Sequence, residues 1–328
     1  MKVDHHLVSV VIPAYNACST IDETLRSVRT QSHENLEIIV VDDGSIDTTS
    51  AIAQEHASHD PRVKIITQKN AGVAAARNTG WKSARSDFIA FIDADDLWAA
   101  TNIERQLQVM LAAGGKTGLV YSWSAIIDAG SRVFNEVPPT LIEGDVLDNI
   151  FQGNFIGNGS AVLVRREALV AAKGFESELH AKGAQGCEDL LFYCRVAESF
   201  HFAVVPEYLV GYRNLPQNMS SNMPRMIRSW MLVMDEMLSR YPDREEKLTR
   251  GLTAYSGYLL VRALGIGKFD YIISLLVLLA QRDPLLVAKV FANDFPRDLA
   301  KAARRRLLRL RFPLSRRPLL PFPIGASS

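Results

Sequence analysis

Alternation of short β-rich runs with helical patterns dominates the first 125 residues and constrains the fold more than any other feature. Continuous apolar strands that alternate with helices pair mainly in parallel and are covered on both faces, so the region predicts an α/β domain with a mostly parallel sheet. Ser19, with Asp22 three residues later, predicts a variant capping box at the start of the first helix. We predict strands at Val8–Ile12, Glu37–Val41, Val63–Thr67, Phe88–Ile92 and Leu119–Ser124, and helices at Thr20–Thr30, Thr48–Ala57, Val73–Ala84 and Asn102–Ala113.

Two further regions follow. Gly, Pro and Asn punctuate the stretch after residue 125, which we interpret as a second lobe, residues 126–222, that completes a site formed by residues 1–125. From residue 223 to 328 the pattern is helical almost throughout, with predicted breaks near Tyr241–Asp243, Gly265–Gly267 and Asp283–Pro284. We therefore predict a domain at 1–222 and a helical C-terminal region at 223–328.

Composition sets limits on the class of protein. Of 328 residues, 48% are hydrophobic and 22% are charged, which is typical of a globular chain and excludes a disordered one. Three cysteines (Cys18, Cys187, Cys194) without a C-x-x-C spacing predict a reducing compartment and no zinc site. The N-terminus resembles no signal peptide, and the longest uncharged apolar stretch, Tyr271–Ala280, is too short to span a bilayer. We expect a cytoplasmic protein that is soluble or peripheral to a membrane.

Charge is unevenly distributed along the chain. The segment 297–317 carries a net charge of +8, whereas the whole chain is +1 and the rest is therefore −7. Leu299, Ala303, Leu307 and Leu310 share one helical face in this segment. A basic amphipathic helix of this kind predicts docking on an anionic membrane surface, at the inner face of the plasma membrane. A solvated basic helix is the alternative, and nucleic-acid binding is disfavoured because the tail lacks interleaved aromatics and the body is acidic.

Polar and acidic residues follow each of the first four predicted strands. These are Pro13-Ala14-Tyr15-Asn16, Asp42-Asp43, Asn70-Ala71-Gly72 and Asp93-Ala94-Asp95-Asp96. Ligands bind at the carboxyl ends of strands in open α/β sheets, so these groups predict a nucleotide site. The carboxylates Asp93, Asp95 and Asp96 would repel one another without a cation, which favours a Mg²⁺ or Mn²⁺ site over a solvated acidic turn.

Two phosphate-binding motifs are absent from the sequence. No G-x-G-x-x-G follows the first strand, which disfavours a dinucleotide cofactor. No G-x-x-x-x-G-K-[ST] occurs, which excludes a P-loop NTPase. Diphosphate binding would then depend on a metal ion and on basic side chains.

Eight motifs in order resemble the family 2 glycosyltransferases of GT-A fold over roughly residues 7–222. They are SVVIPAYN (9–16), VVDDGSIDTT (40–49), NAGVAAARNTG (70–80), FIDADDLW (91–98), GNGSAVLVRREAL (157–169), GFESEL (174–179), CEDLLFYCRVA (187–197) and YRNLPQNMS (212–220). The resemblance implies a GT-A domain in which a nucleotide-binding half precedes an acceptor half.

The resemblance also implies roles for the matching residues. Asp189 would be the general base, and Glu188, with Trp98 as a sugar platform, would hold the acceptor. Asp95 would be the main metal ligand, with Asp93 and Asp96 as its neighbours in the metal site. The donor would contact Pro13, Ala14, Tyr15, Asn16, Asp43, Asn70, Gly72, Arg77 and Arg213.

Each role has a structural alternative. Tyr15 and Trp98 could be packed aromatics, Asp43 could cap a helix, and Arg213 could be a surface residue. Acidic residues such as Glu188 and Asp189 are also favoured at a helix N-terminus whatever the function. Leu215 stands where many relatives carry a histidine, which leaves the role of that loop in donor binding in doubt.

The function that the resemblance implies is inverting transfer of a sugar from a nucleotide diphosphate sugar, with UDP expected, to a hydroxyl of a glycan or lipid-linked acceptor. Such a transfer would serve cell-surface polysaccharide synthesis. One alternative is a nucleotidyltransferase that makes the nucleotide-sugar, although the first strand lacks the glycine-rich basic loop that such an enzyme carries. The other is a catalytically silent, membrane-docked binding protein on the same fold.

Overall fold

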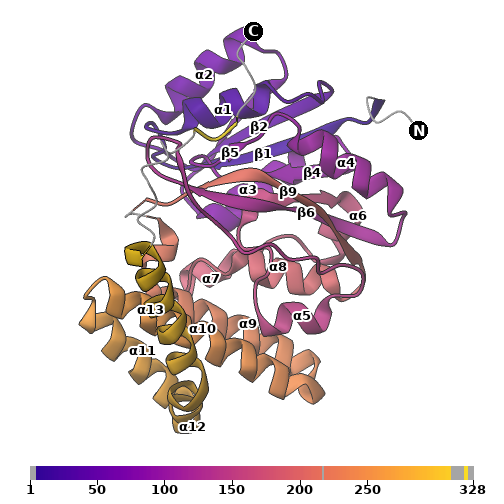
Figure 1. Cartoon of the computed structure of the whole chain (residues 1–328). Coiled ribbons are helices and arrows are strands. Elements are labelled where there is room, and N and C mark those ends of the chain that lie inside the picture. The colour runs from indigo at the N-terminus through magenta and orange to yellow at the C-terminus, as the bar shows by residue number, and fades with distance from the viewer. Residues whose placement is uncertain (1–4, 216–217, 312–320, 324–328) are drawn as a thin grey trace.

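The computed structural model describes residues 5–215, 218–311 and 321–323. Within them the strands form one sheet in the order β3-β2-β1-β4-β8-β6-β9-β5, and β7 pairs with β6 (Figure 1). The strand bounds are β1 Val8–Ala14, β2 Leu36–Asp42, β3 Val63–Thr67, β4 Phe88–Phe91, β5 Leu97–Trp98, β6 Thr117–Ile127, β7 Val133–Glu136, β8 Val162–Arg165 and β9 His201–Arg213.

The first half of the sheet is parallel, as the sequence predicts. β1 pairs in parallel with β2 and β4, and β2 pairs in parallel with β3. Every residue of β1 and β2 is buried, because helices cover both faces: Figure 1 shows α1 (Ile21–Arg29) and α2 (Thr49–His59) above the sheet, and α3 (Val73–Ser83) below it. The carboxyl ends of β1, β2 and β4 therefore open toward the same edge.

The second half corrects the expectation of a mostly parallel sheet. β8 runs antiparallel to β4 and to β6, and β5 runs antiparallel to β9, so that the sheet is mixed. β6 and β9 are parallel to each other. β9 ends at Arg213, and its antiparallel pairing with β5 brings this end beside the loop that follows β4. The α/β class is confirmed, while parallel pairing is limited to part of the sheet.

The predicted helices occur within two residues of their expected bounds, including α4 (Asn102–Ala112). The capping box at Ser19 is wrong, because α1 starts at Ile21 after Thr20 and no side chain caps it. The Thr20 hydroxyl instead donates to the carbonyl of Ala94 at 2.9 Å. Tertiary contact with the acidic loop thus replaces the local cap.

Shorter helices form the lobe between β7 and β9. They are α5 Leu147–Gln152, α6 Arg166–Ala171, α7 Glu178–Ala181 and α8 Glu188–Ala197. α8 is packed on nearly every side, and its first turn begins with Glu188 and Asp189, whose carboxylates meet the edge of the sheet described above. α8 lies below the sheet in Figure 1 and contacts α5, α6 and α9 (Met223–Arg240).

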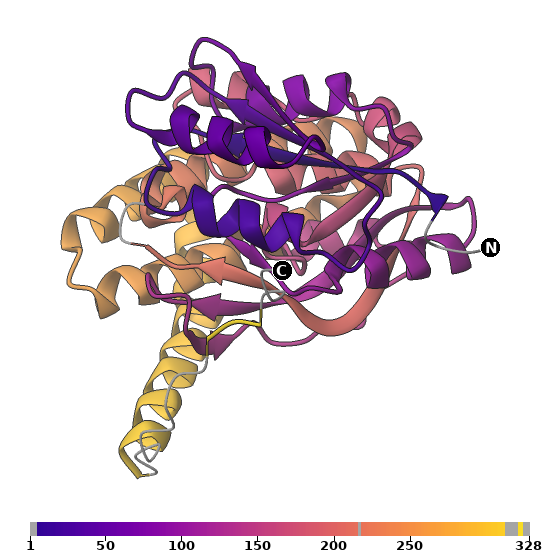
Figure 2. The same ribbon diagram turned by 90° about the horizontal axis from the view of Figure 1, so that it is seen from above.

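The C-terminal region is helical, as predicted, and breaks at the expected places. Its helices are α9 Met223–Arg240, α10 Glu245–Gly265, α11 Phe269–Arg282, α12 Pro284–Lys289, a π-helical turn at Val290–Asp294, and α13 Phe295–Arg311. α10 packs against α9, α11, α13 and α5. Figure 2 shows α13 extending away from the rest of the molecule. None of the helices in the described ranges has both the length and the apolar character needed to cross a bilayer.

The structure describes only part of the basic tail. The backbone of α13 is helical to Arg311, as the pattern predicts, and Lys301 and Arg304 are exposed. Residues 312–320, which include Arg316 and Arg317, lie outside the described residues.

Candidate functional site

One cavity of about 480 Å³ opens at the carboxyl ends of β1, β2 and β4. Twelve of the fifteen residues proposed from the sequence line it: Pro13, Ala14, Tyr15, Asn16, Asp43, Asn70, Gly72, Arg77, Asp93, Asp95, Glu188 and Asp189. Trp98, Asp96 and Arg213 do not. The cavity therefore joins groups from the sheet, from α3 and from the first turn of α8.

One end of the cavity combines an exposed aromatic with a fixed carboxylate. The Tyr15 side chain is 52% exposed at the end of β1, so it is not a packed core residue. Asp43 is buried, and its carboxylate accepts hydrogen bonds from the backbone N–H groups of Ala71 and Gly72 at 2.9 and 2.8 Å. Gly72 has a φ of 91°, which glycine adopts without strain. Asp43 thus orders the loop that begins α3 and faces the cavity beside an open aromatic ring.

Arg77 lies at the centre of the cavity wall. Its Nη2 donates to Asp93 Oδ1 at 2.5 Å, and its guanidinium stacks over the Phe175 ring at 5.3 Å. A Cβ at Gly159 would lie 2.6 Å from Nη2, so the absence of a side chain there makes room for the guanidinium. Burial opposes its charge, but the carboxylates of Asp93, Asp189 and Glu188 outweigh burial and raise the pKa of Arg77.

The three aspartates after β4 differ in their surroundings. Asp95 faces the cavity, and its carboxylate receives no hydrogen bond from another described residue. Burial, with Asp93 nearby, raises the pKa of Asp95 to about 6. A carboxylate without a donor, beside a second carboxylate, fits a divalent cation that takes its other oxygens from a ligand diphosphate. In the described parts of the chain no three His, Cys, Asp or Glu side chains are arranged to hold a metal by themselves.

Asp96 is a structural residue, contrary to its assignment as a metal-site neighbour. It is fully buried, and its carboxylate accepts from the Arg213 backbone N–H at 2.8 Å and from the Ser160 hydroxyl at 2.6 Å. Burial and the neighbouring Asp95 raise the pKa of Asp96 well above its usual range. Both carboxylate oxygens are directed to the protein, so no oxygen is directed to the cavity.

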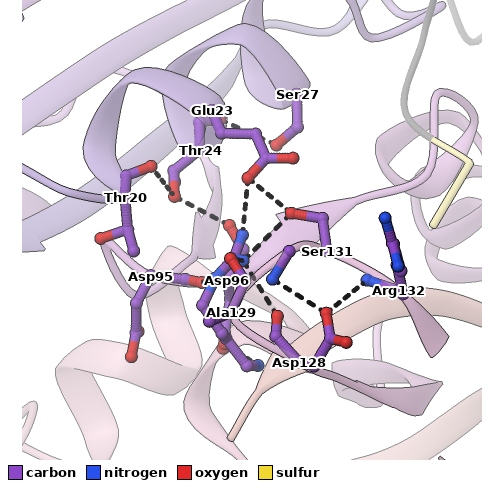
Figure 3. A network of polar contacts seen from close by, with 12 residues as sticks. Thr20, Glu23, Thr24, Ser27, Asp95, Asp96, Asp128, Ala129, Ser131 and Arg132 are labelled. Atoms are coloured by element: carbon purple, nitrogen blue, oxygen red, sulfur yellow. Dashed lines mark hydrogen bonds and ion pairs between the residues drawn. The ribbon is translucent and has the colours of Figure 1, made fainter. Parts of the chain in front are cut away.

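Arg213 is also internal, contrary to its assignment as a donor contact. Its guanidinium donates to the carbonyl oxygens of Asp95, Asp128 and Ala129, to the Ser131 hydroxyl, and to Glu23 on α1. Figure 3 shows the shared surroundings, with Glu23 and Ser131 directed toward the Asp95–Asp96 loop. Arg213 therefore joins α1, the β6–β7 turn and the acidic loop, and it is 1% exposed.

Trp98 is a core residue, contrary to its assignment as a sugar platform. The side chain is fully buried, and its indole N–H donates to the Ser160 carbonyl at 2.8 Å. Because the side chain has no exposed surface and does not line the cavity, the ring is not placed to meet a ligand there.

Asp189 lies on the cavity wall at the start of α8. Burial, together with the Glu188 carboxylate, raises the pKa of Asp189 to about 7, although Arg77 acts in the opposite direction. Its Oδ1 accepts from the Leu190 N–H at 2.7 Å, and Asn154 lies 3.5 Å from Oδ2. Glu188 is buried and accepts from the Gly186 N–H at 2.8 Å. Asp189 is therefore a carboxyl group poised to gain or lose a proton near neutral pH.

Other cavity residues were not identified from the sequence. Asn158 is an example. Its side-chain amide donates to the Ser124 hydroxyl and accepts from the Ser160 backbone N–H, and its backbone carbonyl accepts from the Tyr193 hydroxyl. Its only sequence signal is its place in the G-N-G-S motif. Gln185, which precedes α8, and Asn218, Met219, Ser220 and Met226, which follow β9, also line the cavity. Two residues of the sequence motif at 212–220 line it as well: Tyr212 at the end of β9, and Leu215, which stands in the place of the histidine.

Residues 9–170 match the sequence profile described as Glycosyl transferase family 2. WfgD of Escherichia coli, a UDP-Glc:alpha-D-GlcNAc-diphosphoundecaprenol beta-1,3-glucosyltransferase, is 40% identical over 141 residues, which are 43% of this chain and 54% of WfgD. TuaG of Bacillus subtilis, which is named for teichuronic acid biosynthesis, is 38% identical over 45% of this chain and 59% of TuaG. The chain thus spans little more than half the length of these curated relatives.

Two solved structures share the fold. Staphylococcus aureus TarS 1-349, solved with UDP-GlcNAc, superposes with a TM-score of 0.60 at 18% identity and covers 91% of this chain and 92% of that one. The mannosyltransferase PcManGT of Pyrobaculum calidifontis, solved with GDP-Man and Mn²⁺, has a TM-score of 0.55 at 17% identity over 92% and 80% of the two chains.

Proposed function

Because this chain belongs to glycosyl transferase family 2, we propose that it transfers a sugar from a nucleotide diphosphate sugar to an acceptor hydroxyl. The observation that carries the proposal is the meeting of Asp189 with Asp93, Asp95 and Arg77 in one cavity whose far end holds Tyr15 and Asp43. In this proposal Asp189 accepts the proton of the acceptor hydroxyl. Arg77, and a cation held by Asp93 and Asp95, compensate the charge of the diphosphate, and Tyr15 stacks on the base.

Asp189 is the general base in this proposal. A sugar hydroxyl is a poor nucleophile at neutral pH, so its proton must leave as the oxygen attacks the anomeric carbon. The pKa of about 7 at Asp189 suits this task, since the optimum for a general base lies near the working pH. The transfer is a single displacement in which the nucleoside diphosphate leaves from the opposite face, and Glu188 holds the acceptor.

The donor occupies the end of the cavity formed by β1, β2 and α3. Tyr15 stacks on the base, Asp43 and the 13–16 backbone hold the nucleoside, and Arg77 faces the diphosphate. Asp95, with Asp93, would hold Mg²⁺ or Mn²⁺. A bound cation would supply charge compensation for the leaving diphosphate.

A UDP-sugar donor and a lipid-linked or glycan acceptor are the finer parts of the proposal. Support comes from WfgD, whose name states both a UDP-sugar and a diphosphoundecaprenol acceptor. Such acceptors lie at a membrane surface, which fits docking of the basic 297–317 segment on anionic lipid at the inner face of the plasma membrane. Cell-surface polysaccharide synthesis is the corresponding role, with residues 1–222 as catalytic domain and 223–328 as helical region.

The alternatives have less support. A nucleotidyltransferase would need a basic glycine-rich loop after β1, where this chain carries Pro13 to Asn16. A silent binding protein has no use for a carboxyl group such as Asp189 whose pKa is raised into the neutral range, because that shift stabilises nothing at working pH.

A thermal-shift panel of nucleotide-sugars with and without Mn²⁺ tests the donor half of the proposal, because a ligand bound to the native state alone raises its stability. We expect a shift with at least one UDP-sugar, larger with Mn²⁺ present, and release of UDP over time. No shift with any nucleotide-sugar or nucleoside diphosphate contradicts the proposal.

A further inference from the structure

An exposed apolar and basic surface lies at the rim of the cavity, where three helices of the C-terminal region meet. We define the rim patch as Met219, Tyr258, Arg262, Ile266, Lys268 and Phe269. Ile266 and Phe269 are 59% and 65% exposed in the turn between α10 and α11, although both are large apolar side chains. Contiguous exposed apolar residues of this kind mark interaction sites on soluble domains.

One hydrogen bond ties the rim patch to the cavity. Arg262 donates to the Ser220 carbonyl at 3.0 Å, and Ser220 and Met219 line the cavity. Tyr258 is one helical turn before Arg262 on α10, and it stacks through Tyr255 on Trp230 of α9. Ile266 is one turn after Arg262. The apolar residues therefore stand beside the part of the cavity rim that Met219 and Ser220 form.

The apolar surface continues along α11. Phe269, Ile273 and Val277 recur every four residues and are exposed, while Leu275 and Leu279 on the other face are buried against the neighbouring helices. A helix normally turns its apolar stripe toward the core. α11 instead has apolar residues on both faces, so its outer stripe is left without a partner in the described part of the chain.

The charges around the rim patch favour a lipid surface over a second copy of this chain. Among the described residues Arg225, Arg228, Arg262 and Lys268 form no ion pair, and their polar contacts are with neutral groups. The exposed carboxylate of Asp270 offsets only one of these four positive charges. A two-fold interface would place these like charges opposite each other. Anionic headgroups would compensate them, while Ile266 and Phe269 enter the boundary between headgroups and acyl chains.

We propose that the rim patch and the outer stripe of α11 dock the protein on an anionic bilayer, with the cavity rim at Met219 and Ser220 facing the lipid. The purpose of this docking rests on the proposed function, because it would bring a lipid-linked acceptor to Asp189. The surface is distinct from the 297–317 segment. That segment's helix, α13, packs on α10 and begins beside Gly257, so both surfaces belong to helices that contact α10.

Vesicle cosedimentation of the full chain tests the proposal. The probes are vesicles of phosphatidylcholine alone and of phosphatidylcholine with phosphatidylglycerol. The test variant is Ile266→Glu with Phe269→Glu, and the matched control is Leu141→Glu with Val170→Glu, two equally exposed apolar residues elsewhere. We expect the wild type and the control to bind the anionic vesicles, and the test variant to bind them at least roughly tenfold more weakly.

Two further measurements separate the possible failures. Tryptophan introduced as Phe269→Trp should be quenched by bromine-labelled acyl chains, whereas tryptophan introduced as Val170→Trp should not. The nucleotide-sugar thermal shift should be the same in the test variant as in the wild type, so loss of folding or of donor binding is told apart from loss of docking. If no donor stabilises any variant while the vesicle pattern holds, the proposed function fails and the docking surface stands.

Three results overturn the inference. They are equal binding of test and control variants to anionic vesicles, absence of quenching at position 269, and a wild-type dimer in lipid-free sedimentation velocity that the test variant abolishes. In the last case the surface is an interface between copies of the chain.

Discussion

Arg77 and Asp93 form an ion pair of 2.5 Å that joins α3 to the acidic loop after β4. The pair leaves the neighbouring Asp95 as the carboxylate of this loop that faces the cavity without a hydrogen-bond donor from another described residue. One aspartate is therefore compensated by the protein, and the other is available to a cation or to a ligand that brings one.

Replacement of Arg77 by Gln should lower both stability and donor affinity. Removal of one partner from a buried ion pair leaves an uncompensated charge and costs about 3–5 kcal/mol. The control is Arg26→Gln, which removes a surface pair with Asp22 and should cost less than about 1 kcal/mol. Urea unfolding and nucleotide-sugar titration of both variants measure the two effects. Equal unfolding midpoints for the two variants would show that loss of the Arg77–Asp93 pair destabilises the protein no more than loss of a surface pair.

Asp95 and Asp96 should respond differently to substitution. Asp95→Ala should abolish donor binding and the Mn²⁺ response with little change in stability, because its carboxylate holds nothing in the protein. Asp96→Ala should instead lower the free energy of unfolding by roughly 2 kcal/mol or more, because the Arg213 N–H and the Ser160 hydroxyl lose their acceptor. Calorimetric titration and denaturant unfolding check the pair. A stable Asp96→Ala protein that no longer responds to Mn²⁺ would return Asp96 to the metal site.

Arg213→Lys should disturb the acidic loop, because Arg213 holds the loop through the Asp95 carbonyl. Lysine has three donors on one nitrogen and cannot reach the five acceptors that the planar guanidinium meets, so we expect a loss of about 2–4 kcal/mol in stability. Asp95 should then be less well positioned, which weakens donor binding without changing the pH profile of transfer. Unfolding and donor titration measure these effects, and a shifted pH profile would mean that Arg213 reaches the reacting groups.

The sequence predicted the groups near strand ends better than the groups behind them. Tyr15, Asp43 and Asp95 follow directly from the rule that ligands bind at the carboxyl ends of parallel strands. Asp96, Trp98 and Arg213 were misassigned because their roles depend on partners far along the chain: Asp96 meets residues 64 and 117 positions away. The Ser19 cap failed for the same reason, since Thr20 found Ala94 instead. Local pattern cannot reveal contacts such as those of Asp96, which arise from the antiparallel pairing of β8 with β4 and of β9 with β5.

The kcat/KM of transfer should rise with pH through about 7, because it reports the ionisation of the free enzyme and Asp189 must be ionised to accept a proton. Stability should show the opposite trend. Burial raises the pKa of Asp189 from 3.8, so the folded state retains a proton that the unfolded state releases, and stability falls as pH rises from about 4 to 7. Glu188, Asp93 and Arg77 face the same group, and the Arg77 guanidinium opposes the rise in the pKa of Asp189.

Asp189→Asn should therefore stabilise the protein at pH 8 by on the order of 1 kcal/mol, because water in the cavity screens part of the burial penalty. At pH 4 most of the gain should be lost, since the folded aspartic acid is neutral and the unfolded one is only about half ionised. Thermal unfolding at the two pH values measures the difference. A variant less stable than wild type at pH 8 would show that the charged carboxylate is stabilised by Arg77 more than burial opposes it.

The role of Asp189 as general base is tested most directly by comparing nucleoside diphosphate release and donor binding in wild type and Asp189→Asn. Asp145→Asn is the control at an exposed position. With a UDP-sugar that stabilises the wild type, and an acceptor glycan, the account predicts a transfer rate roughly 10²–10⁴ lower in Asp189→Asn, with donor affinity and the Mn²⁺ response unchanged. The control should match the wild type. An Asp189→Asn protein that keeps more than about a hundredth of the wild-type rate would contradict the assignment of Asp189 as the general base.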